Sequence, residues 1–517
     1  MSATLTKRWT LITMVLASGI VFLDGTVVNV ALPTIDRNLH AGLSGLQWIV
    51  DGYLVTLAAL LIVGGALGDR YGRRRLMVVG LSAFGVASVA CGLAPATSWL
   101  VVARMLQGVA GALLVPGSLA IITAVYPAGE ERGKAIGSWA GWAGITTLLG
   151  PLLGGWLVDT VSWRWVFFIN VPLIVVTVGL LSRYVPETRD ETASGQLDWL
   201  GALLVCLTLG GVTYGLIQGP VAGWSSPLVL GGLIGGVVAL LLFVVVERRV
   251  RHPMVPLVLF RSVTFSGANL ATLGIYTALS GMSFFVILFL QNVAGYSALR
   301  AGLALLPVTL IMMSLSGVAG KQAGKYGSRL FMTIGPLICA AGFLLLLRLQ
   351  PTSGFWAVLL PAAIIIGLGL VVTVAPLTTA VMAAVPAHNA GIASAINNVV
   401  SRVAGLLAVA GLGAIVALTF TTALASRAGS VPAAARPALQ QAAQDPTGAH
   451  DPTKMPAEAA RVIAEAYTFA FHRAMLICAA LSALGGIVSA FMIRNPAPAA
   501  KPDGQLADPS ERLAPTA

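Results

Sequence analysis

Long apolar stretches follow one another along almost the whole chain, and short polar segments separate them. A helix needs about 20 apolar residues to cross the hydrocarbon layer of a membrane, and each stretch is long enough. We therefore predict an all-α membrane protein with 14 transmembrane helices. The predicted helices are 9–31, 46–67, 76–95, 98–124, 133–158, 163–181, 197–217, 227–246, 263–291, 298–320, 329–348, 354–383, 390–420 and 466–493.

The first apolar stretch follows Lys7 and Arg8, as the apolar part of a secretory signal peptide would. It is too long for a signal peptide, it contains Asp24 and Asn29, and no clear small-residue cleavage site follows it. We expect it to remain in the protein as the first transmembrane helix.

Two polar loops resemble each other, which indicates an internal repeat. The loop 65–74 matches the loop 320–329, and Tyr326 lies 255 residues after Tyr71. The same shift places predicted helices 1 to 5 on helices 9 to 13. The expected parts are a six-helix bundle (1–190), two inserted linker helices (191–255), a second six-helix bundle (256–493) with an extracellular insertion (421–465), and a disordered cytoplasmic tail (494–517). Two pseudo-symmetric bundles around a central cavity are typical of secondary transporters.

The chain is 57% hydrophobic and 10% charged, with a formal net charge of +12. Most of its 31 Lys and Arg residues fall in the loops of one side when the N-terminus is placed in the cytoplasm. Since such residues are retained on the cytoplasmic side, we expect a multi-pass inner (cytoplasmic) membrane protein with both termini inside. These residues would face an anionic leaflet, which accounts for the charge without nucleic acid.

Motifs for enzymatic chemistry are missing. The segment 129–134 comes nearest to a phosphate-binding loop, but its spacing is wrong and the following hydroxyl residue is absent. The four cysteines lie far apart within apolar stretches, and the histidines have no metal-ligand spacing. We therefore expect no enzyme, no catalytic residue, no metal site and no cofactor.

Five segments carry recognisable motifs: 23–33 in the first helix, the loop 65–75, 104–108 in the fourth helix, 150–155 in the fifth and 163–172 at the start of the sixth. Together they resemble the major facilitator superfamily, and within it the fourteen-helix drug/proton antiporter branch of EmrB/QacA type. The resemblance covers about 9–493. It implies multidrug efflux, in which a proton-coupled antiporter exports small amphiphilic drugs, cationic or neutral. Export of one metabolite or self-made antibiotic is the alternative.

Two of these motifs are predicted to take part in conformational change. The loop motif comprises Gly65, Asp69, Arg70, Gly72, Arg73 and Arg74, and its charges can form a cytoplasmic gate that ties the two halves together. A simple topology signal is the alternative. The fifth-helix motif comprises Gly150, Pro151, Gly154 and Gly155. Its small residues suit close helix packing, and the resemblance identifies it as the antiporter motif of exporters.

Ionisable residues inside the predicted helices are functional candidates because a charge is costly there. Asp24, Asp51 and Arg104 lie at similar predicted depths, so they can meet in one layer. We predict that Asp24 carries the proton and balances a cation, that Arg104 tunes it, and that Asp51 helps to recognise the cation. A static ion-paired cluster that fixes helix packing is the alternative.

Polar and aromatic residues at the expected interface of the two halves are candidates for a substrate pocket. They are Asn29, Tyr53, Gln107, Trp142, Tyr276, Phe285, Gln291, Asn398 and Arg402. The second half has no acid inside a predicted helix, which favours monovalent lipophilic cations or neutral or zwitterionic compounds. The expected partners are a small-molecule substrate, protons and the lipid bilayer. The sequence leaves a periplasmic adaptor or outer-membrane channel undecided. A channel, or a receptor that moves nothing, is a further alternative.

Overall fold

The computed structural model describes residues 3–127, 130–189, 198–250, 253–386, 390–428, 431–444, 446 and 455–495, and these contain no strand. The first group of helices is α1 (Ala3–Leu39), α2 (Gly42–Tyr71), α3 (Arg73–Gly92), α4 (Thr97–Ala112), α5 (Val115–Val125), α6 (Glu130–Thr160), α7 (Trp165–Phe168) and α8 (Asn170–Tyr184). The pair α9 (Trp199–Ala222) and α10 (Pro227–Arg249) follows.

The last group consists of α11 (Val263–Leu288), α12 (Ala298–Ala304), α13 (Leu306–Tyr326), α14 (Ser328–Leu345), α15 (Leu360–Ala383), α16 (Ala390–Leu407), α17 (Gly413–Arg427), α18 (Arg436–Gln444) and α19 (Ala457–Met492). Short π-helical or 3-10 segments are η1 (Leu257–Arg261), η2 (Phe289–Val293), η3 (Leu346–Arg348), η4 (Phe355–Leu359), η6 (Ala408–Leu412) and η8 (Ala433–Ala435). The predicted tail (494–517) falls outside the described residues from 496 onward, as do parts of the predicted linker and insertion.

Thirteen helical segments among the described residues are long and apolar enough to cross a membrane, so the all-α membrane fold is confirmed. Helix α6, with 31 residues, is not one of these thirteen, but it lies against α1 along the bundle. Four predicted helices are each divided into two α-helices, and in one of them the segment η6 separates α16 from α17. The α4–α5 junction precedes Pro116, the α12–α13 junction precedes Pro307, and α7 and α8 replace one predicted helix. Proline lacks the N–H that would continue the helical hydrogen bonds.

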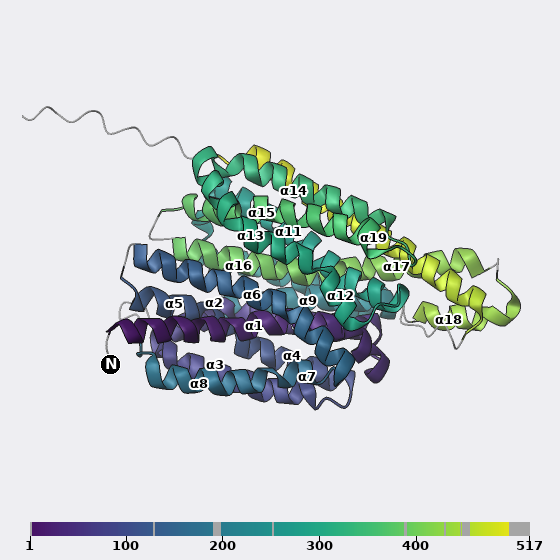
Figure 1. Cartoon of the computed structure of the whole chain (residues 1–517), viewed down its shortest axis with the longest axis horizontal. Helices are drawn as coiled ribbons and strands as arrows, with labels where there is room; N and C mark the ends of the chain where they lie inside the picture. The colour runs from purple at the N-terminus through teal and green to yellow at the C-terminus, as the bar shows by residue number, and fades with distance from the viewer. Residues whose placement is uncertain are drawn as a thin grey trace, which may run out of the picture.

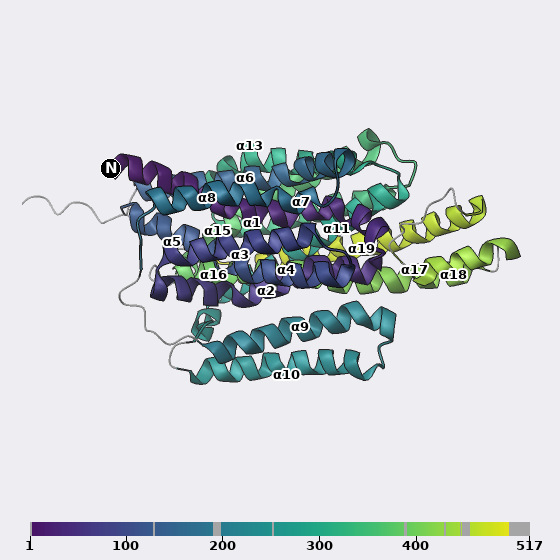
Figure 2. The same cartoon turned by 90° about the horizontal axis from the view of Figure 1, so that it is seen from below.

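The helices form two groups that lie side by side. Helices α1–α8 occupy one part of the molecule and α11–α19 the other (Figure 1). Helices α9 and α10 form a separate pair beside them, in which α9 packs on α2 (Figure 2). A Cβ built at Gly211 of α9 would lie 2.6 Å from the carbonyl oxygen of Gly232 of α10, so these helices touch through their backbones. Small residues at such contacts are typical of membrane helices.

Helices α17, α18 and α19 extend together beyond the bundles at the end opposite the N-terminus (Figures 1 and 2). The last helix begins at Ala457, earlier than the predicted start at 466, and α17 continues to Arg427. Part of the predicted polar insertion (421–465) is therefore helical rather than irregular. Buried residues such as Leu439 and Val462 hold this projection together through an apolar core.

The two groups are held together by hydrogen bonds in one half of the molecule. We call it the outer half because it contains the segments 40–41, 161–164 and 294–297, which the sequence predicts to lie on the side opposite the cytoplasm. Gln291 Nε2 donates to the Val30 carbonyl (2.9 Å), and Gln47 Nε2 donates to the Val409 carbonyl (2.6 Å). The Asp159 carboxylate accepts the N–H groups of Ala298 (3.1 Å) and Leu299 (2.9 Å). These hydrogen bonds close the two groups against each other in the outer half.

Candidate functional site: a buried ion pair and the face between the bundles

A buried polar cluster in the first bundle centres on Asp24 of α1. Its Oδ1 accepts hydrogen bonds from Gln107 Nε2 (2.9 Å) and Asn170 Nδ2 (3.0 Å). Its Oδ2 accepts from Arg104 Nη1 at 2.5 Å, and this contact is also an ion pair. The Asp24 side chain is 0% exposed and that of Arg104 is 2% exposed. A buried charge requires this kind of pairing because its desolvation is costly.

The rest of Arg104 is held as firmly. Its Nε donates to the Ile49 carbonyl (3.1 Å), and its guanidinium lies 4.3 Å from the centre of the Tyr53 ring. Gln107 accepts from Arg104 through Oε1 (2.7 Å) and donates from Nε2 to Ser88 Oγ (2.9 Å). Helices α1, α2, α3, α4 and α8 therefore converge on one electrically neutral pair inside the first bundle.

Sequence reasoning identified Asp24, Arg104 and Gln107 but missed Asn170 and Ser88. The search for charges inside apolar stretches overlooks neutral polar side chains, which cost less to bury. A signal was nevertheless present for Asn170. It lies within the motif 163–172, as a lone amide in an apolar segment.

Asp51 of α2 does not join this cluster. The residue is fully buried, and neither carboxylate oxygen has a hydrogen-bond partner. It lies on the same helical face as Gln47, four residues earlier, and Leu54, three residues later. Gln47 bonds the Val409 carbonyl, and a Cβ built at Gly405 would lie 3.7 Å from Leu54 Cδ1. This face of α2 therefore lies against α16 and η6, between the two bundles.

The opposite side of α1 from Asp24 is less covered. Phe22 and Asn29 are half-buried and Gly25 is exposed, and a Cβ built at Gly25 would have no heavy atom within 4 Å. Across from them, the Arg402 guanidinium of α16 lies 5.8 Å from the centre of the Phe22 ring. We define the inter-bundle face as Phe22, Gly25 and Asn29 of α1 together with Asn398 and Arg402 of α16.

The other predicted pocket residues lie at partly exposed positions, in the outer closure or in bundle interiors. Tyr276 is half-buried on α11, and Trp142 is 50% exposed on α6. Gln291 belongs to the outer closure. Tyr53, Gln107 and Phe285 lie in bundle interiors, where Phe285 packs edge-on against Phe284.

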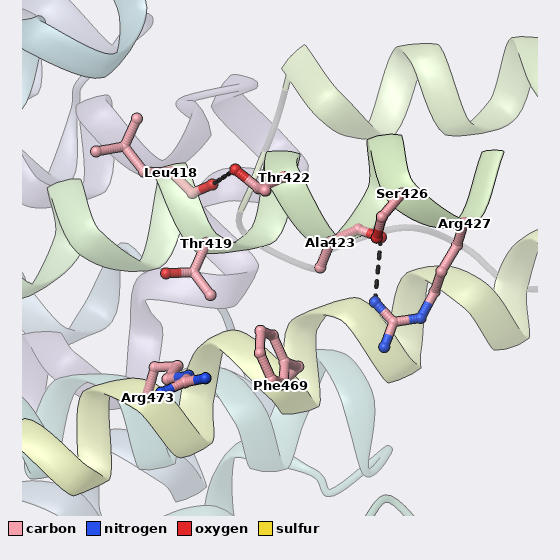
Figure 3. A pocket seen from close by; sticks show the side chains of 8 residues that line it. All are labelled: Leu418, Thr419, Thr422, Ala423, Ser426, Arg427, Phe469 and Arg473. Atoms are coloured by element: carbon pink, nitrogen blue, oxygen red, sulfur yellow. Dashed lines mark hydrogen bonds between the residues drawn. The ribbon is translucent and has the colours of Figure 1, made fainter.

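A groove far from these residues was not predicted. It has a volume of about 500 Å³ and lies between α17 and α19 (Figure 3). Arg427 donates to the Ala423 carbonyl at its rim (3.1 Å), and the Arg473 guanidinium lies 5.1 Å from the Phe469 ring. A second hollow of about 380 Å³, between α3 and α8, is lined by apolar residues such as Val86 and Val175.

The predicted gate loop is fastened to its own bundle. Asp69 forms an ion pair with Arg73 (2.8 Å), and Arg73 Nη1 donates to the Ala120 carbonyl (3.3 Å). The backbone N–H of Arg74 donates to Glu187 Oε1 (2.9 Å). Gly72 ends α2 with a φ of 105°, a conformation that favours glycine.

The remaining loop residues frame this arrangement. Gly65 packs beside Pro116, and the Arg70 guanidinium lies 5.1 Å from the Tyr71 ring. The expected Asp69–Arg73 pair is thus present within the first bundle. Its use as a gate between the halves stays a prediction.

The fifth-helix motif lies where α6 touches both bundles. A Cβ built at Gly154 would lie 2.7 Å from Val27 Cγ2, and one built at Gly155 would lie 2.5 Å from Leu299 Cα. Gly150 faces Thr26 in the same way, and the Pro151 carbonyl lies beside Gly302 of α12. The motif therefore lets α6 approach α1 closely and helps to close the outer half against α12.

Known proteins share both the sequence and the fold. Residues 14–409 match the Major Facilitator Superfamily. The multidrug resistance protein Stp of Mycobacterium tuberculosis (strain CDC 1551 / Oshkosh) is 36% identical over 445 residues, 86% of this chain and 80% of Stp. The tetracenomycin C resistance and export protein of Streptomyces glaucescens is 37% identical over 80% of this chain and 76% of its own. The puromycin resistance protein pur8 of Streptomyces alboniger is 36% identical over 83% and 85%.

Solved structures support the fold. A bacterial homolog to the human lysosomal transporter Spinster, inward-facing and unoccupied, has a TM-score of 0.67 at 17% identity and covers 95% of this chain and 99% of its own. A D-xylose-proton symporter has a TM-score of 0.63 at 15% identity over 94% and 98%. Sequence and fold together define a multi-pass membrane transporter rather than an enzyme. The chain belongs to the Major Facilitator Superfamily and, as its motifs predicted, to the fourteen-helix drug/proton antiporter branch.

Proposed function

We propose that this protein exports small amphiphilic compounds from the cytoplasm in exchange for protons. Relatives at 36–37% identity are named for multidrug, tetracenomycin C and puromycin resistance, which supports export of toxic organic molecules. The observation that carries the proton coupling is the contrast between two buried carboxyl groups. Asp24 is paired with Arg104, whereas Asp51 has no partner.

Asp24 is ionised in this proposal while the outer half is closed. Three side chains donate hydrogen bonds to it. An ionised carboxylate can accept all three, whereas a protonated acid uses one of its oxygens as an O–H donor and accepts fewer. Proton uptake would weaken its pairing with Arg104 and free α1 to move relative to α4. The pair thus links the protonation of α1 to the packing of the bundle.

Asp51 is neutral in the same state. An ionised carboxylate without a partner is costly to bury, so packing α2 against α16 and η6 favours the protonated acid. The charged groups on neighbouring helices include Asp24 on α1, Arg104 on α4 and Arg402 on α16. In the described part of the chain, none of them forms an ion pair with Asp51. Closure of the outer half therefore follows proton uptake at Asp51 from the outer side, which is the direction of proton entry that the exchange requires.

The proposal includes a topology. Helix α6 is the fourteenth transmembrane helix, so the chain has six, two and six helices, with both termini in the cytoplasm of the inner membrane. The bundles correspond to 1–190 and 256–493, separated by the linker helices within 191–255. Asp69, Arg73 and Arg74 then lie on the cytoplasmic side and serve as the gate when that side closes.

The test uses the purified full-length protein in proteoliposomes with an imposed pH gradient and rhodamine B, a zwitterionic amphiphile, as the substrate probe. Wild-type protein should move the dye against its gradient and move protons in the opposite direction. Asp24→Asn and Asp51→Asn should each abolish the proton flux. Glu465→Gln, on the exposed part of α19, removes a carboxylate elsewhere and should leave it unchanged. Normal proton flux in both Asn variants would refute the coupling sites, and a wild type that exchanges no protons during transport would refute antiport.

The second candidate function is export of one particular antibiotic. The names of relatives that specify a single compound, tetracenomycin C or methylenomycin A, favour it. A resistance panel of structurally unrelated drugs in a pump-deficient host separates the two functions. Protection against one chemical scaffold alone would favour the narrow function, and protection across several scaffolds the broad one.

A further inference from the structure

The charge on the inter-bundle face bears on the substrate class, and this inference rests on the proposed function. Asp24 is oriented into the first bundle and is neutralised there by Arg104. Asp51 is sealed within the closed outer half. Neither acid belongs to the inter-bundle face, so neither balances a cation there in this conformation.

Arg402 is the ionisable side chain of this face. It is half-buried and lies twelve residues after Ala390, where α16 begins, which corresponds to roughly 18 Å along a helix. That places it near the middle of a hydrocarbon layer about 30 Å thick. Within the described ranges, Arg402 forms no hydrogen bond and no ion pair, and its guanidinium faces the Phe22 ring at 5.8 Å. A charge kept at such depth without a counter-ion indicates a functional role.

The face of α16 that carries Arg402, together with its continuation into η6 and α17, is covered by α2 at one end and uncovered at the other. Val409 and Gly413 follow at seven and eleven residues, on the same side of the helix. There the Gln47 amide covers it, bonding the Val409 carbonyl and leaving no room for a Cβ on Gly413. In the other direction, Asn398 is exposed. Arg402 therefore lies where the outer closure ends and the uncovered part of the face begins.

We propose that Arg402 binds a negatively charged group of the transported amphiphile, so that the substrates are anionic or zwitterionic. A guanidinium offers paired N–H donors that match a carboxylate or sulfonate. The Phe22 ring and the open space beside Gly25 receive the apolar part. A cation without an acidic group would meet a like charge in a medium of low dielectric constant, where the repulsion is strong.

This assignment has an electrical consequence. If one proton enters for each anion that leaves, two positive charges move inward per cycle. Exchange of a proton for a monovalent cation moves no net charge. An inside-negative membrane potential should therefore accelerate transport of an anion and leave that of a cation unchanged.

The test compares two probes of nearly identical shape and opposite charge, tetraphenylborate and tetraphenylphosphonium, by calorimetric titration of the purified full-length protein. We expect wild-type protein to bind tetraphenylborate at least about tenfold more tightly than tetraphenylphosphonium, because like charges repel at a desolvated site. Arg402→Gln should remove this preference and Arg402→Lys should retain part of it. Arg183→Gln removes the same charge from an exposed position in the last turn of α8 and should change neither affinity.

Equal affinities in the wild type, binding of neither probe, or an equal loss for both probes in Arg402→Gln would each overturn the assignment. The outcomes also separate this inference from the proposed function. If tetraphenylborate binds through Arg402 but a pH gradient drives neither probe in proteoliposomes, export fails and anion binding stands. If the gradient drives transport and Arg402→Gln leaves the charge preference unchanged, only the anion assignment fails.

Discussion

The two bundles, which the sequence predicts to be related by an internal repeat, bury different polar groups. The first encloses the Asp24–Arg104 ion pair. The second joins α16 to α11 through neutral groups, since Asn397 Nδ2 donates to Asn269 Oδ1 (3.1 Å) and Thr272 Oγ1 (2.8 Å). Both networks link helices inside a bundle. Only the first contains a carboxyl group, Asp24.

The comparison indicates that the duplicated fold and the transport chemistry are separable. Helix packing needs satisfied polar groups, and amides and hydroxyls provide them as well as charges do. We therefore propose that the ion pair in the first bundle has a role beyond packing, namely proton exchange. The second bundle contributes Arg402, a half-buried charge that forms no ion pair in the described part of the chain, and we assign it to the substrate.

The largest effect is expected when the buried polar cluster of the first bundle loses Arg104. Arg104→Ala leaves Asp24 buried without its counter-ion and should lower the free energy of unfolding by about 3–5 kcal/mol. The double variant Arg104→Ala with Asp24→Asn should recover much of that loss, because no charge remains uncompensated. Thermal unfolding of the detergent-solubilised protein measures both. A double variant no more stable than the single one would show that the loss comes from packing alone.

The next largest effect is expected when Gly155 of the first bundle is replaced by the residue at the corresponding position of the second. The 255-residue repeat places Gly155 on Ala410, which already carries a methyl group. Gly155→Ala would force a Cβ to within 2.5 Å of Leu299 Cα and should cost about 1–3 kcal/mol of outer closure.

Transport should then slow by about tenfold for each 1.4 kcal/mol, since that energy shifts an equilibrium by a factor of ten. Labelling of a cysteine introduced at Val30 reports how often the outer half opens. Gly141→Ala, on the same helix, where the added methyl group meets no neighbour, is the matched control. Equal labelling of both variants would contradict the role of the motif in closure.

A smaller effect is expected in the second network. Asn397→Ala removes two hydrogen bonds between neutral groups and should lower the free energy of unfolding by about 1–3 kcal/mol. Proton flux per transported substrate should remain as in the wild type, because no charge is lost. A changed proton-to-substrate ratio in proteoliposomes would place proton chemistry in the second bundle as well.

The smallest effect belongs to the loop. The Asp69–Arg73 pair spans one helical turn and is partly exposed, so Asp69→Asn should change the free energy of unfolding by only about 0.3–0.5 kcal/mol. If the loop also acts as a gate, transport should fall far more than this value implies. Transport and unfolding that change by the same small amount would leave the loop as a topology signal.

Much of the architecture could be predicted because a membrane demands long apolar helices whatever their neighbours. The depths of Asp24 and Arg104 anticipated their contact, since residues at one level of adjacent helices can meet. Depth leaves rotation about the helix axis undetermined. For this reason Asp51, at a similar level, could not be assigned in advance to the other side of α2.

Rotation also explains the distribution of the predicted pocket residues. Phe285 and Tyr53 are aromatic residues of the kind expected in a binding site, but their helices are rotated so that both side chains lie in bundle interiors. Asn170 escaped notice because a neutral amide is tolerated among apolar residues and stands out only once its partner Asp24 is seen.

The sequence alone determined that this chain crosses a membrane many times and which family its motifs belong to. Length, hydropathy and local motifs suffice for these properties because each depends on a short segment and on the lipid around it. Only the tertiary structure decided which charges pair, which acid is left alone between the bundles, and that Arg402 faces the uncovered surface. These depend on how each helix is rotated against its neighbours, and packing between distant segments sets that rotation.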